Sequence, residues 1–556
     1  MDGTYRDEAS LRFLHPISNR DKNVRKHAFD ATVKTVETWL TGYATPFNSL
    51  ESIASVNGVG NNLAIGKLQE RIPDLLRLVC GCPFKDIRDK SKCLLDDLKK
   101  KGKGKGLKIP KRLNNVSYFI PEKEVVAVDC KDEQTQMLFI DAFIQNNRLD
   151  HITQMMGYHP HYLDCFLRTQ QYLLRGDGPL PYHYRHYIAI MAAGRHQCSY
   201  LVNLHTQEFI LAGGDLSWLD GVQFIPPKLR DLYEINKILA HRPWLVTKDH
   251  ISKLTKGKDN WSISELVHAL ILLSHFHALS SFVYGCGITP EVDHEGGYTY
   301  NSGKSSPSVS NGNSKSSSKH SSPSSSFSES GGDLGIDVLM ERMKRLTESD
   351  DTMEMTSEEL LQQFEKVENQ SAEITTSANI PTPKKDVLKF VLEPDFVYQD
   401  FAKRGSQSEI PSFRAQEYSW EDHGFSMANR YYSEIGTLLD DKFTCAYNLT
   451  YYTLGDKMNV DTTMFRRAVW NYIHCMYGIR HDDYNYAEVN QMLERNLKAY
   501  IKTVTCYPER LTKKDYESVM REFKHSEKVH VNLMLLEARL QGELLYSLRA
   551  VMQHMT

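Results

Sequence analysis

The sequence lacks the cysteine spacing of a zinc site or a disulfide framework. Its 556 residues include ten cysteines, but these are scattered and form no paired C-x-x-C sets. In a reducing compartment we expect free thiols, most of them acting as small buried hydrophobic residues. The sequence therefore predicts neither a bound metal nor a cofactor.

A strong net charge, a leader segment and an unbroken apolar run are also missing. The net charge is −3, so no global field draws the chain to nucleic acid or to an anionic membrane. The first twenty residues are polar and contain no signal-peptide core, which predicts a cytoplasmic protein and allows a nuclear one. The most apolar stretch, residues 265–288, is interrupted by His268, His275 and His277, so we interpret it as a core helix and not a membrane span.

Alternating β-type patterns are almost absent, and helical signals replace them. Ser262 and Glu265 form a capping box at the start of a helix that we expect to end near Gly285. Pro243 is placed to stop one helix, and Thr247 is placed to cap the next. These patterns predict an all-α protein, and its length suggests two to four domains.

Composition divides the chain into four parts. Residues 1–112 predict a helical N-terminal extension of short helices that ends in a basic run, 99–112. We interpret that run as a flexible, solvated linker, with a phosphate or nucleic-acid patch as the alternative. The other parts are a first helical half at 113–293, a connector at 294–410, and a second half at 411–556 that ends in a long apolar-striped helix.

The connector is dominated by serine. Residues 302–332 contain almost no apolar side chains, so burial cannot offset chain entropy and we expect this segment to be disordered. Two amphipathic helical patterns follow it, IDVLMERMKRL and SEELLQQFEKVENQ.

A cysteine and a histidine stand close together in GRHQCSYLVNLH, residues 194–205. Peroxide reduction needs an accessible thiolate beside a group that moves a proton, and Cys198, Tyr200 and His205 supply those groups. In a helix, His205 would return to the face that carries Cys198. The alternative is that Cys198 is an ordinary small core residue.

The second half contains the groups that a free amino acid requires. A carboxylate needs a cation, an ammonium group needs an anion, and a side chain needs an apolar slot. The candidates are Thr450, Tyr451, Thr453, Thr462, Phe465, Arg466, Met520 and Glu527. Arg466 is suited to a carboxylate and Glu527 to an ammonium group, whereas Thr462 has the alternative role of a helix N-cap.

An acidic pair follows in RHDDYNY. Asp482 and Asp483 are predicted to stand at the end of a helix, where carboxylates oppose the helix dipole. That placement favours a role beyond local stability, and a solvated turn is the alternative.

Four longer motifs resemble the sestrins, which are stress-induced regulators of growth signalling. They are MAAGRHQCSYLV, HRPWLVTKDHI, YGIRHDDYNYAEVNQMLERNLKAYIKT and FKHSEKVHVNLMLLEARLQ. The resemblance covers residues 113–556 apart from the serine-rich segment. It implies an all-α fold of two halves similar to the AhpD alkyl hydroperoxidase fold. Such a duplication would account for the similarity between RHYIAIMAAGRHQCSY and RRAVWNYIHCMYGIRHDDYNY.

The resemblance also implies roles for the first half. It assigns Cys198, Tyr200 and His205 to a weak alkyl hydroperoxide reductase activity, so whether the chain is an enzyme stays open. AhpD-type enzymes carry a second cysteine where this chain has Leu201, and their relay acid falls on His186 by count. Without an adjacent resolving thiol, we expect turnover to be slow.

In the second half the resemblance implies a leucine site and a partner surface. The leucine-binding motif matches the polar candidates above together with His159, whereas Phe465 and Met520 depart from it. Asp482, Asp483 and Tyr484 match the surface that binds the GATOR sub-complex upstream of the target-of-rapamycin kinase. Rag-type small GTPases are a further implied partner, although the sequence has no P-loop.

The implied function is therefore an amino-acid sensor that inhibits its partner when the amino acid is scarce. The alternative is a thiol peroxidase whose second half is structural.

Overall fold

The computed structural model is helical almost throughout. It describes residues 15–41, 59–103, 105–109, 115–257, 260–291, 335–349, 356–370, 385–406 and 410–556. Within these residues the strands are two residues long and form two separate pairs, β1 with β4 and β2 with β3. The predicted all-α class is confirmed. The serine-rich segment 302–332, predicted to be disordered, lies outside the described residues.

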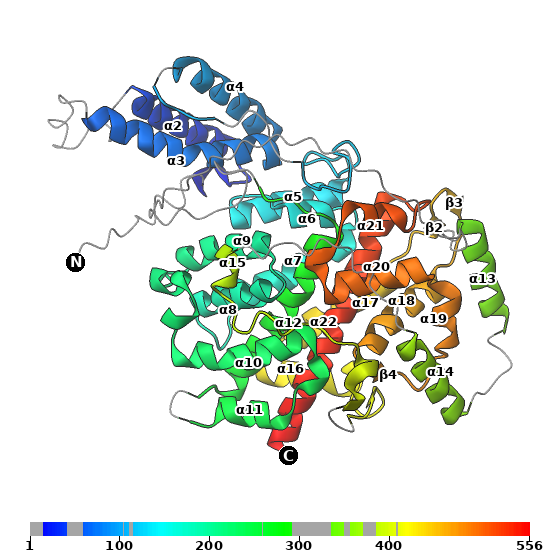
Figure 1. Ribbon diagram of the computed structural model, residues 1–556. Coiled ribbons are helices and arrows are strands. Elements are labelled where there is room, and N and C mark those ends of the chain that lie inside the picture. The colour runs from blue at the N-terminus through cyan, green and yellow to red at the C-terminus, as the bar shows by residue number, and fades with distance from the viewer. Residues whose placement is uncertain are drawn as a thin grey trace, which may run out of the picture.

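Three helices form a small unit of their own at the N-terminal side (Figure 1). They are α2 (Lys22–Leu40), α3 (Val59–Gly81) and α4 (Lys85–Lys101), preceded by the short η1 (His15–Ile17). The prediction of short helices was wrong, because α3 is 23 residues long and continues through Pro73. Buried apolar side chains on both sides of that proline, including Ile72 and Leu76, stabilise the helix across the lost hydrogen bond.

The basic run that was predicted as a loop begins inside a helix. Lys99, Lys100 and Lys101 form the last turn of α4, where cations favourably oppose the helix dipole. The loop prediction was therefore wrong for these three residues. Farther along, the Lys105 ammonium donates to the carbonyl of Leu40 at 2.8 Å, which ties the run back to α2.

Both halves share one large hydrophobic core around two long helices, α12 and α22. The first half contains α5 (Glu133–Asn146), α6 (His151–Met156), α7 (Pro160–Arg175), α8 (Tyr182–Arg195), α9 (Ser199–Leu211), α10 (Pro227–His241), α11 (Lys248–Thr255) and α12 (Ile263–Gly285). They are connected in part by three short η helices, which are η3 (Leu216–Asp220), η4 (Val222–Phe224) and η5 (Pro243–Leu245).

The second half also consists mainly of helices, and it contains the four short strands. It contains β1 (Phe413–Arg414), η7 (Trp420–Gly424), α16 (Phe425–Tyr431), α17 (Ile435–Asn448), β2 (Thr453–Leu454), β3 (Lys457–Met458), α18 (Thr463–Met476), β4 (Ile479–Arg480), α19 (Ala487–Met492), α20 (Arg495–Cys506), η8 (Pro508–Arg510), α21 (Lys513–Ser518) and α22 (His525–Met555). The predicted long C-terminal helix is α22, and it lies against α12 at the centre of the molecule (Figure 1).

The predicted helix limits in the first half are confirmed. Ser262 and Glu265 form the capping box of α12, which ends at Gly285. The helix α10 ends just before Pro243, and Thr247 forms a capping box with His250 at the start of α11. Although α12 is the one described helix long and apolar enough to cross a membrane, its apolar window is entirely buried, as expected of a core helix.

The similarity between the two halves is visible in two buried arginines. Arg185, in the first turn of α8, donates to the carbonyls of Leu173 and Gly176 at the end of α7, at 3.3 and 2.7 Å. Arg466, in the first turn of α18, donates to the carbonyl of Tyr447 at the end of α17. Each half thus joins two consecutive helices with the same contact.

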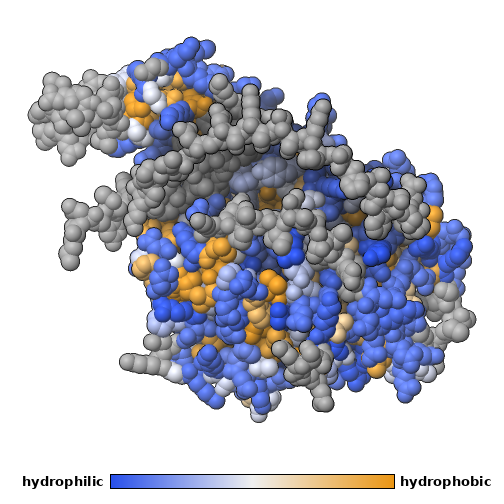
Figure 2. Space-filling model, in the orientation of Figure 1, coloured by the Kyte–Doolittle hydropathy of each residue, from blue (hydrophilic) through white to orange (hydrophobic). Residues whose placement is uncertain are grey.

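The two amphipathic helices of the connector are present and pack on the second half. They are α13 (Ile336–Ser349) and α14 (Ser357–Asn369), and both contact α18 and α19 (Figure 1). The shorter α15 (Lys385–Leu388) and η6 (Phe401–Ser406) follow. The face of the molecule drawn in Figure 2 is largely hydrophilic, as expected of helices that bury one apolar side.

Candidate functional site

Cys198 lies between two helices rather than within one. It occupies the cap position before α9, and the residue is 1% exposed. Tyr200, in the first turn of α9, donates a hydrogen bond to the carboxylate of Glu291 at 2.5 Å. Burial and the Glu291 charge both raise the pKa of Tyr200, so its hydroxyl keeps its proton at neutral pH.

The third candidate of the first half, His205, contacts another histidine. Its Nδ1 lies 3.1 Å from Nδ1 of His186, the residue that the sequence placed at the relay-acid position. Burial lowers the pKa of His186 to about 4 and the pKa of His205 well below its usual value, so both rings are neutral at pH 7. One Nδ1–H therefore donates to the other ring, and Nε2 of His205 is buried with no hydrogen-bond partner among the described residues.

A small cavity of about 40 Å³ adjoins the two histidines and is also lined by Arg148, Arg175 and Glu208. Cys198 and Tyr200 do not line it. The structure thus gives two of the three candidates other partners, since Tyr200 binds Glu291 and His205 contacts His186.

Tyr284 is a neighbour of Cys198 that the sequence reasoning missed. Its hydroxyl donates to the carbonyl of Gln197 at 2.7 Å. Burial raises the pKa of Tyr284, and the Cys198 charge is the next cause. The residue belongs to α12, far along the chain, so no local pattern pointed to it.

The loop between α17 and α18 carries four candidates of the second half, Thr450, Tyr451, Thr453 and Thr462. The Thr450 hydroxyl accepts a hydrogen bond from the Tyr452 amide at 3.1 Å. The Val460 amide donates a hydrogen bond to the Tyr452 carbonyl at 3.0 Å, which closes the base of the loop. Thr453 begins β2, and the hairpin turns at Gly455. A Cβ at Gly455 would lie 2.6 Å from the Glu522 carbonyl, so the turn requires glycine.

His159 connects this loop to the first half. It is 1% exposed at the start of α7, its Nδ1 lies 3.0 Å from the Tyr451 hydroxyl, and its Nε2 lies 2.8 Å from the Ser526 carbonyl. Burial lowers the pKa of His159 to about 4, so the ring is neutral. Because the carbonyl requires a donor, the proton is on Nε2 and the Tyr451 hydroxyl donates to Nδ1.

Arg466 is buried without a carboxylate partner. The residue is 5% exposed, and its guanidinium donates to the hydroxyls of Thr462 at 3.1 Å and Thr463 at 3.0 Å, and to the Tyr447 carbonyl. Among the described residues, no carboxylate lies within ion-pair distance of it. Burial lowers the pKa of Arg466, and the charge of Asp461 is the largest effect that opposes this shift.

Thr462 occupies the N-cap position of α18, as the alternative interpretation predicted, but its side chain does not cap the helix. Thr462 precedes α18, yet its hydroxyl makes no capping bond. Asp461 instead accepts from the Thr463 amide at 2.9 Å. The Thr462 hydroxyl is therefore available to orient Arg466, as Nε–H of that guanidinium donates to it.

Glu527 holds the tip of the same loop. Its carboxylate accepts from the Gly455 amide at 2.9 Å and from the Lys524 amide at 2.8 Å, which caps α22. Arg466 thus contacts the base of the loop 449–462 and Glu527 contacts its tip, and no direct ion pair joins them in the described part of the chain.

Apolar side chains lie beside these polar groups. Phe465 is 3% exposed and meets Phe523 edge to face, with ring centroids 5.9 Å apart. Met520 is 4% exposed in a left-handed backbone conformation with φ of 49°, and its carbonyl accepts from the Phe523 amide at 3.0 Å. The two candidates that depart from the family motif therefore share one neighbour.

His530 was not predicted, although it lies one turn after Glu527 on α22. Its ring is 5.6 Å from that of His159, and its Nε2 lies 2.9 Å from the Ala446 carbonyl. Burial lowers the pKa of His530 to about 3, with His159 and Arg466 among the further causes. His530 therefore contacts the histidine of the first half and the end of α17, and the i, i+3 spacing from Glu527 was the available signal.

Asp482 and Asp483 do not stand at the end of a helix, so the prediction that they oppose a helix dipole was wrong. The helix α18 ends at Met476, and Asp482 and Asp483 lie in a turn after β4. Asp482 is compensated by Arg414 at 2.6 Å and by Arg480 at 2.9 Å.

The rest of this acidic segment differs in exposure. Asp483 is exposed, whereas Tyr484 is 2% exposed and packs edge to face on Tyr486. The carboxylate of Asp483 is thus the more accessible of the candidate partner groups.

Comparison with known proteins identifies relatives over most of the chain. The family described as PA26 p53-induced protein (sestrin) matches residues 115–555. The chain is 52% identical to sestrin-3 of Mus musculus over 456 residues, which are 79% of this chain and 92% of that protein. It is 52% identical to sestrin-2 of Homo sapiens over 447 residues, 79% and 91% of the two chains. With the sestrin homolog of Drosophila melanogaster it shares 48% over 465 residues, 73% and 93% of the two chains.

Proposed function

The chain belongs to the sestrin family, and from that premise we propose that it senses a leucine-type amino acid. When that amino acid is scarce, the free protein binds and inhibits the GATOR sub-complex upstream of the target-of-rapamycin complex. Rag-type small GTPases are further candidate partners, and the cytoplasm, with the nucleus as a second compartment, is the expected location.

The observation that carries this proposal is the uncompensated charge of Arg466. A buried cation that lacks an anionic partner is costly, whereas a bound carboxylate would compensate it through paired N–H donors. The hydroxyls of Thr462 and Thr463 already hold the guanidinium in a fixed orientation. A ligand carboxylate is therefore the group that this site fits best.

The remaining parts of a free amino acid also have partners here. Glu527 supplies an anion for the ammonium group, and the loop that it holds is the proposed lid. Phe465, Phe523 and Met520 would enclose the side chain. Burying a leucine side chain contributes roughly 1.5–3 kcal/mol, and replacing an aromatic wall by Met520 removes about 1 kcal/mol of it. We expect retained binding with a shifted preference among leucine, isoleucine and methionine.

The partner surface is connected to this site through α18. The helix carries Arg466 in its first turn and leads through β4 to Asp482, whose carboxylate joins β4 to β1 through Arg414. A ligand that moves the start of α18 would therefore move Asp482 and Asp483. By linkage, the amino acid and the partner would weaken each other's binding equally.

Recovery of the GATOR sub-complex on the immobilised full chain tests the proposal. Leucine is expected to lower the recovery, and Asp483→Ala is expected to lower it in the absence of leucine. Asp422→Ala, an exposed carboxylate on η7, is the control that should leave it unchanged. Equal recovery with and without leucine would remove the antagonism from the account.

Slow hydroperoxide reduction at Cys198 is a second proposal; Nε2 of His205 has no partner among the described residues and is free to accept a proton, whereas the thiol itself, at 1% exposure, would have to become accessible to the peroxide. Thiolate attack on the peroxide would give an alcohol and a sulfenic acid. An external thiol would have to reduce that sulfenic acid, because Leu201 occupies the place of a resolving cysteine. Cys198→Ser should abolish turnover and leave partner binding intact. Loss of partner binding in that variant would favour the alternative in which redox chemistry is primary.

A further inference from the structure

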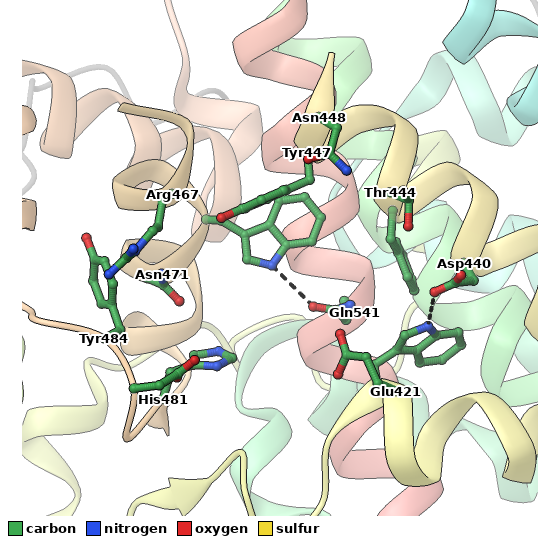
Figure 3. A pocket seen from close by; sticks show the side chains of 14 residues that line it. Glu421, Asp440, Thr444, Tyr447, Asn448, Arg467, Asn471, His481, Tyr484 and Gln541 are labelled. Carbon is green, nitrogen blue, oxygen red and sulfur yellow. Dashed lines mark hydrogen bonds between the residues drawn. The ribbon is translucent and has the colours of Figure 1, made fainter. Parts of the chain in front are cut away.

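A second cavity lies beside Tyr447. It has a volume of about 390 Å³, is open to solvent on one side, and is lined by residues of η7, α17, α18, α22 and the turn after β4 (Figure 3). Tyr447 contributes to both places, since its side chain lines the cavity and its carbonyl binds Arg466. None of the candidate leucine-binding residues lines this cavity.

Two tryptophans form much of its wall, and both have committed indole N–H groups. Trp420 donates to Asp440 at 3.0 Å, and Trp470 donates to Gln541 at 3.2 Å, as the dashed lines in Figure 3 show. Tyr447 packs edge to face on Trp470, with centroids 5.4 Å apart. The rings are therefore fixed in orientation, and what they offer a ligand is aromatic surface rather than hydrogen bonds.

The charged side chains of the cavity are mainly acidic. Glu421, Asp440 and Asp483 line it, and neither Glu421 nor Asp483 forms an ion pair with another described residue. The cation of the lining is Arg467, which already lies 3.5 Å from Glu488 outside the cavity.

The histidine of the lining does not offset these carboxylates. Burial lowers the pKa of His481, so its ring is neutral at pH 7 even though Asp483 and Asp482 oppose that shift. The interior is thus negative and aromatic.

Two buried amides in the lining have unused hydrogen-bonding groups. Asn471 is 8% exposed, and its side-chain amide has no hydrogen-bond partner among the described residues. Gln541 is also 8% exposed and uses only its oxygen, as the acceptor for Trp470. Neither amide is among the described side-chain groups that are both fully buried and unpaired, so these groups face the open cavity, where a ligand with donors and acceptors can reach them.

We propose that this cavity binds an organic cation, a guanidinium or primary ammonium group on a short apolar stem. The cation would lie against the indole rings and near the carboxylates, and its N–H groups would donate to the Asn471 oxygen. The same chemistry is found in free alkylguanidines or amines and in arginine or lysine side chains of a partner protein. Asp483 also belongs to the proposed partner surface, so a ligand in the cavity and the partner would both contact the Asp483 carboxylate.

Binding can be followed by ¹⁹F NMR of the full chain labelled with 5-fluorotryptophan. Trp420→Phe and Trp470→Phe assign the two cavity signals among the six tryptophans. The free-ligand probe is n-butylguanidinium, with neutral n-butylurea as its isosteric control. The partner-type probe is acetyl-Ala-Arg-Ala-amide, with its citrulline counterpart as control. We expect a cationic probe to shift both signals and the neutral controls to leave them unchanged.

Glu421→Gln combined with Asp440→Asn should weaken that binding about tenfold, whereas the exposed Glu517→Gln should not. A response to n-butylguanidinium supports a free cation, and a response to the peptide alone supports a partner side chain. No response to either probe up to about 10 mM, or an equal response to the neutral controls, overturns the proposal. Leucine binding by the double variant, measured separately, keeps a failure of this site distinct from a failure of the amino-acid site.

Discussion

His159 of the first half accepts a hydrogen bond from the hydroxyl of Tyr451 in the second half, at 3.0 Å. The same ring donates to the Ser526 carbonyl, just before Glu527. One buried imidazole therefore holds the loop after α17 and the start of α22 together. The two halves meet at the proposed amino-acid site, and not only through their shared core.

Replacement of His159 by alanine should weaken amino-acid binding several-fold. The change removes two hydrogen bonds, each of which contributes about 1 kcal/mol, and frees the Tyr451 end of the loop. His161→Ala on the exposed side of the same helix is the matched control. Calorimetric titration of both variants with leucine measures the effect. Equal affinities would show that His159 has only a structural role.

The buried histidines predict a loss of stability in mild acid. Burial lowers the pKa of His159 and His186 to about 4 and the pKa of His268 and His530 to about 3, from an ordinary 6.5. As the pH falls below 6.5, the unfolded chain takes up protons that the folded chain does not bind. The free energy of unfolding should therefore decrease between pH 6.5 and 4, by up to about 1.4 kcal/mol per pH unit for each histidine.

Thermal unfolding monitored by circular dichroism at a series of pH values checks this effect. The full stabilisation should be present above pH 6.5 and should decline toward pH 4. A midpoint that stays constant or rises as the pH falls would contradict it.

A buried ion pair connects α17 to α22. The Lys442 ammonium lies 3.0 Å from the Glu537 carboxylate, both side chains are 0% exposed, and the Tyr162 hydroxyl also donates to Glu537. Glu537→Leu should lower the free energy of unfolding by about 3–5 kcal/mol, because it leaves Lys442 buried without a partner. The double variant Lys442→Met, Glu537→Leu should recover part of that loss. Chemical denaturation gives these values, and a double variant less stable than Glu537→Leu would disprove the pairing.

Two cysteines from different halves also meet. A hydrogen bond from the Cys445 thiol lowers the pKa of Cys165 to about 7, and the Arg168 guanidinium lies 3.4 Å from the same sulfur. Because the thiolate is the nucleophile, Cys165 should be alkylated by iodoacetamide at neutral pH, with a rate that rises through about pH 7. Mass spectrometry of the labelled peptides measures the rates against the exposed Cys93. Cys445→Ala, which removes the donor, should slow the reaction of Cys165 at pH 7, and a faster reaction would contradict the proposed contact.

The sequence predicted the fold class and several helix ends because those signals are local. A capping box such as Ser262 with Glu265 depends on residues three apart, and the structure confirms it. The acidic pair was misplaced because the chain leaves α18 at Met476 and turns through Gly478, at φ of 74°, into a short strand that has no alternating pattern. That strand is defined by pairing with β1, which the local sequence does not encode.

The candidate sites show the same division between local and distant information. Individual candidates such as Arg466 and Glu527 could be chosen by residue type and family motif. Their hydrogen-bond partners, the Tyr447 carbonyl and the Gly455 amide, are backbone groups that no side-chain pattern reveals. Tyr284 and His530 were missed because their significance comes from contacts between distant segments.

Calorimetric titration of the full chain with leucine, isoleucine, methionine and arginine is the most direct test of the account. At least one aliphatic amino acid should bind the unmodified chain and the exposed control Arg495→Ala with the same affinity. Arg466→Ala should lose about 2–3 kcal/mol of binding free energy, and Arg466→Lys should recover only part of it, because a lysine cannot form the paired bonds of a guanidinium. If no aliphatic amino acid gives heat with the unmodified chain, or if Arg466→Ala binds it equally well, then this guanidinium does not receive the ligand carboxylate.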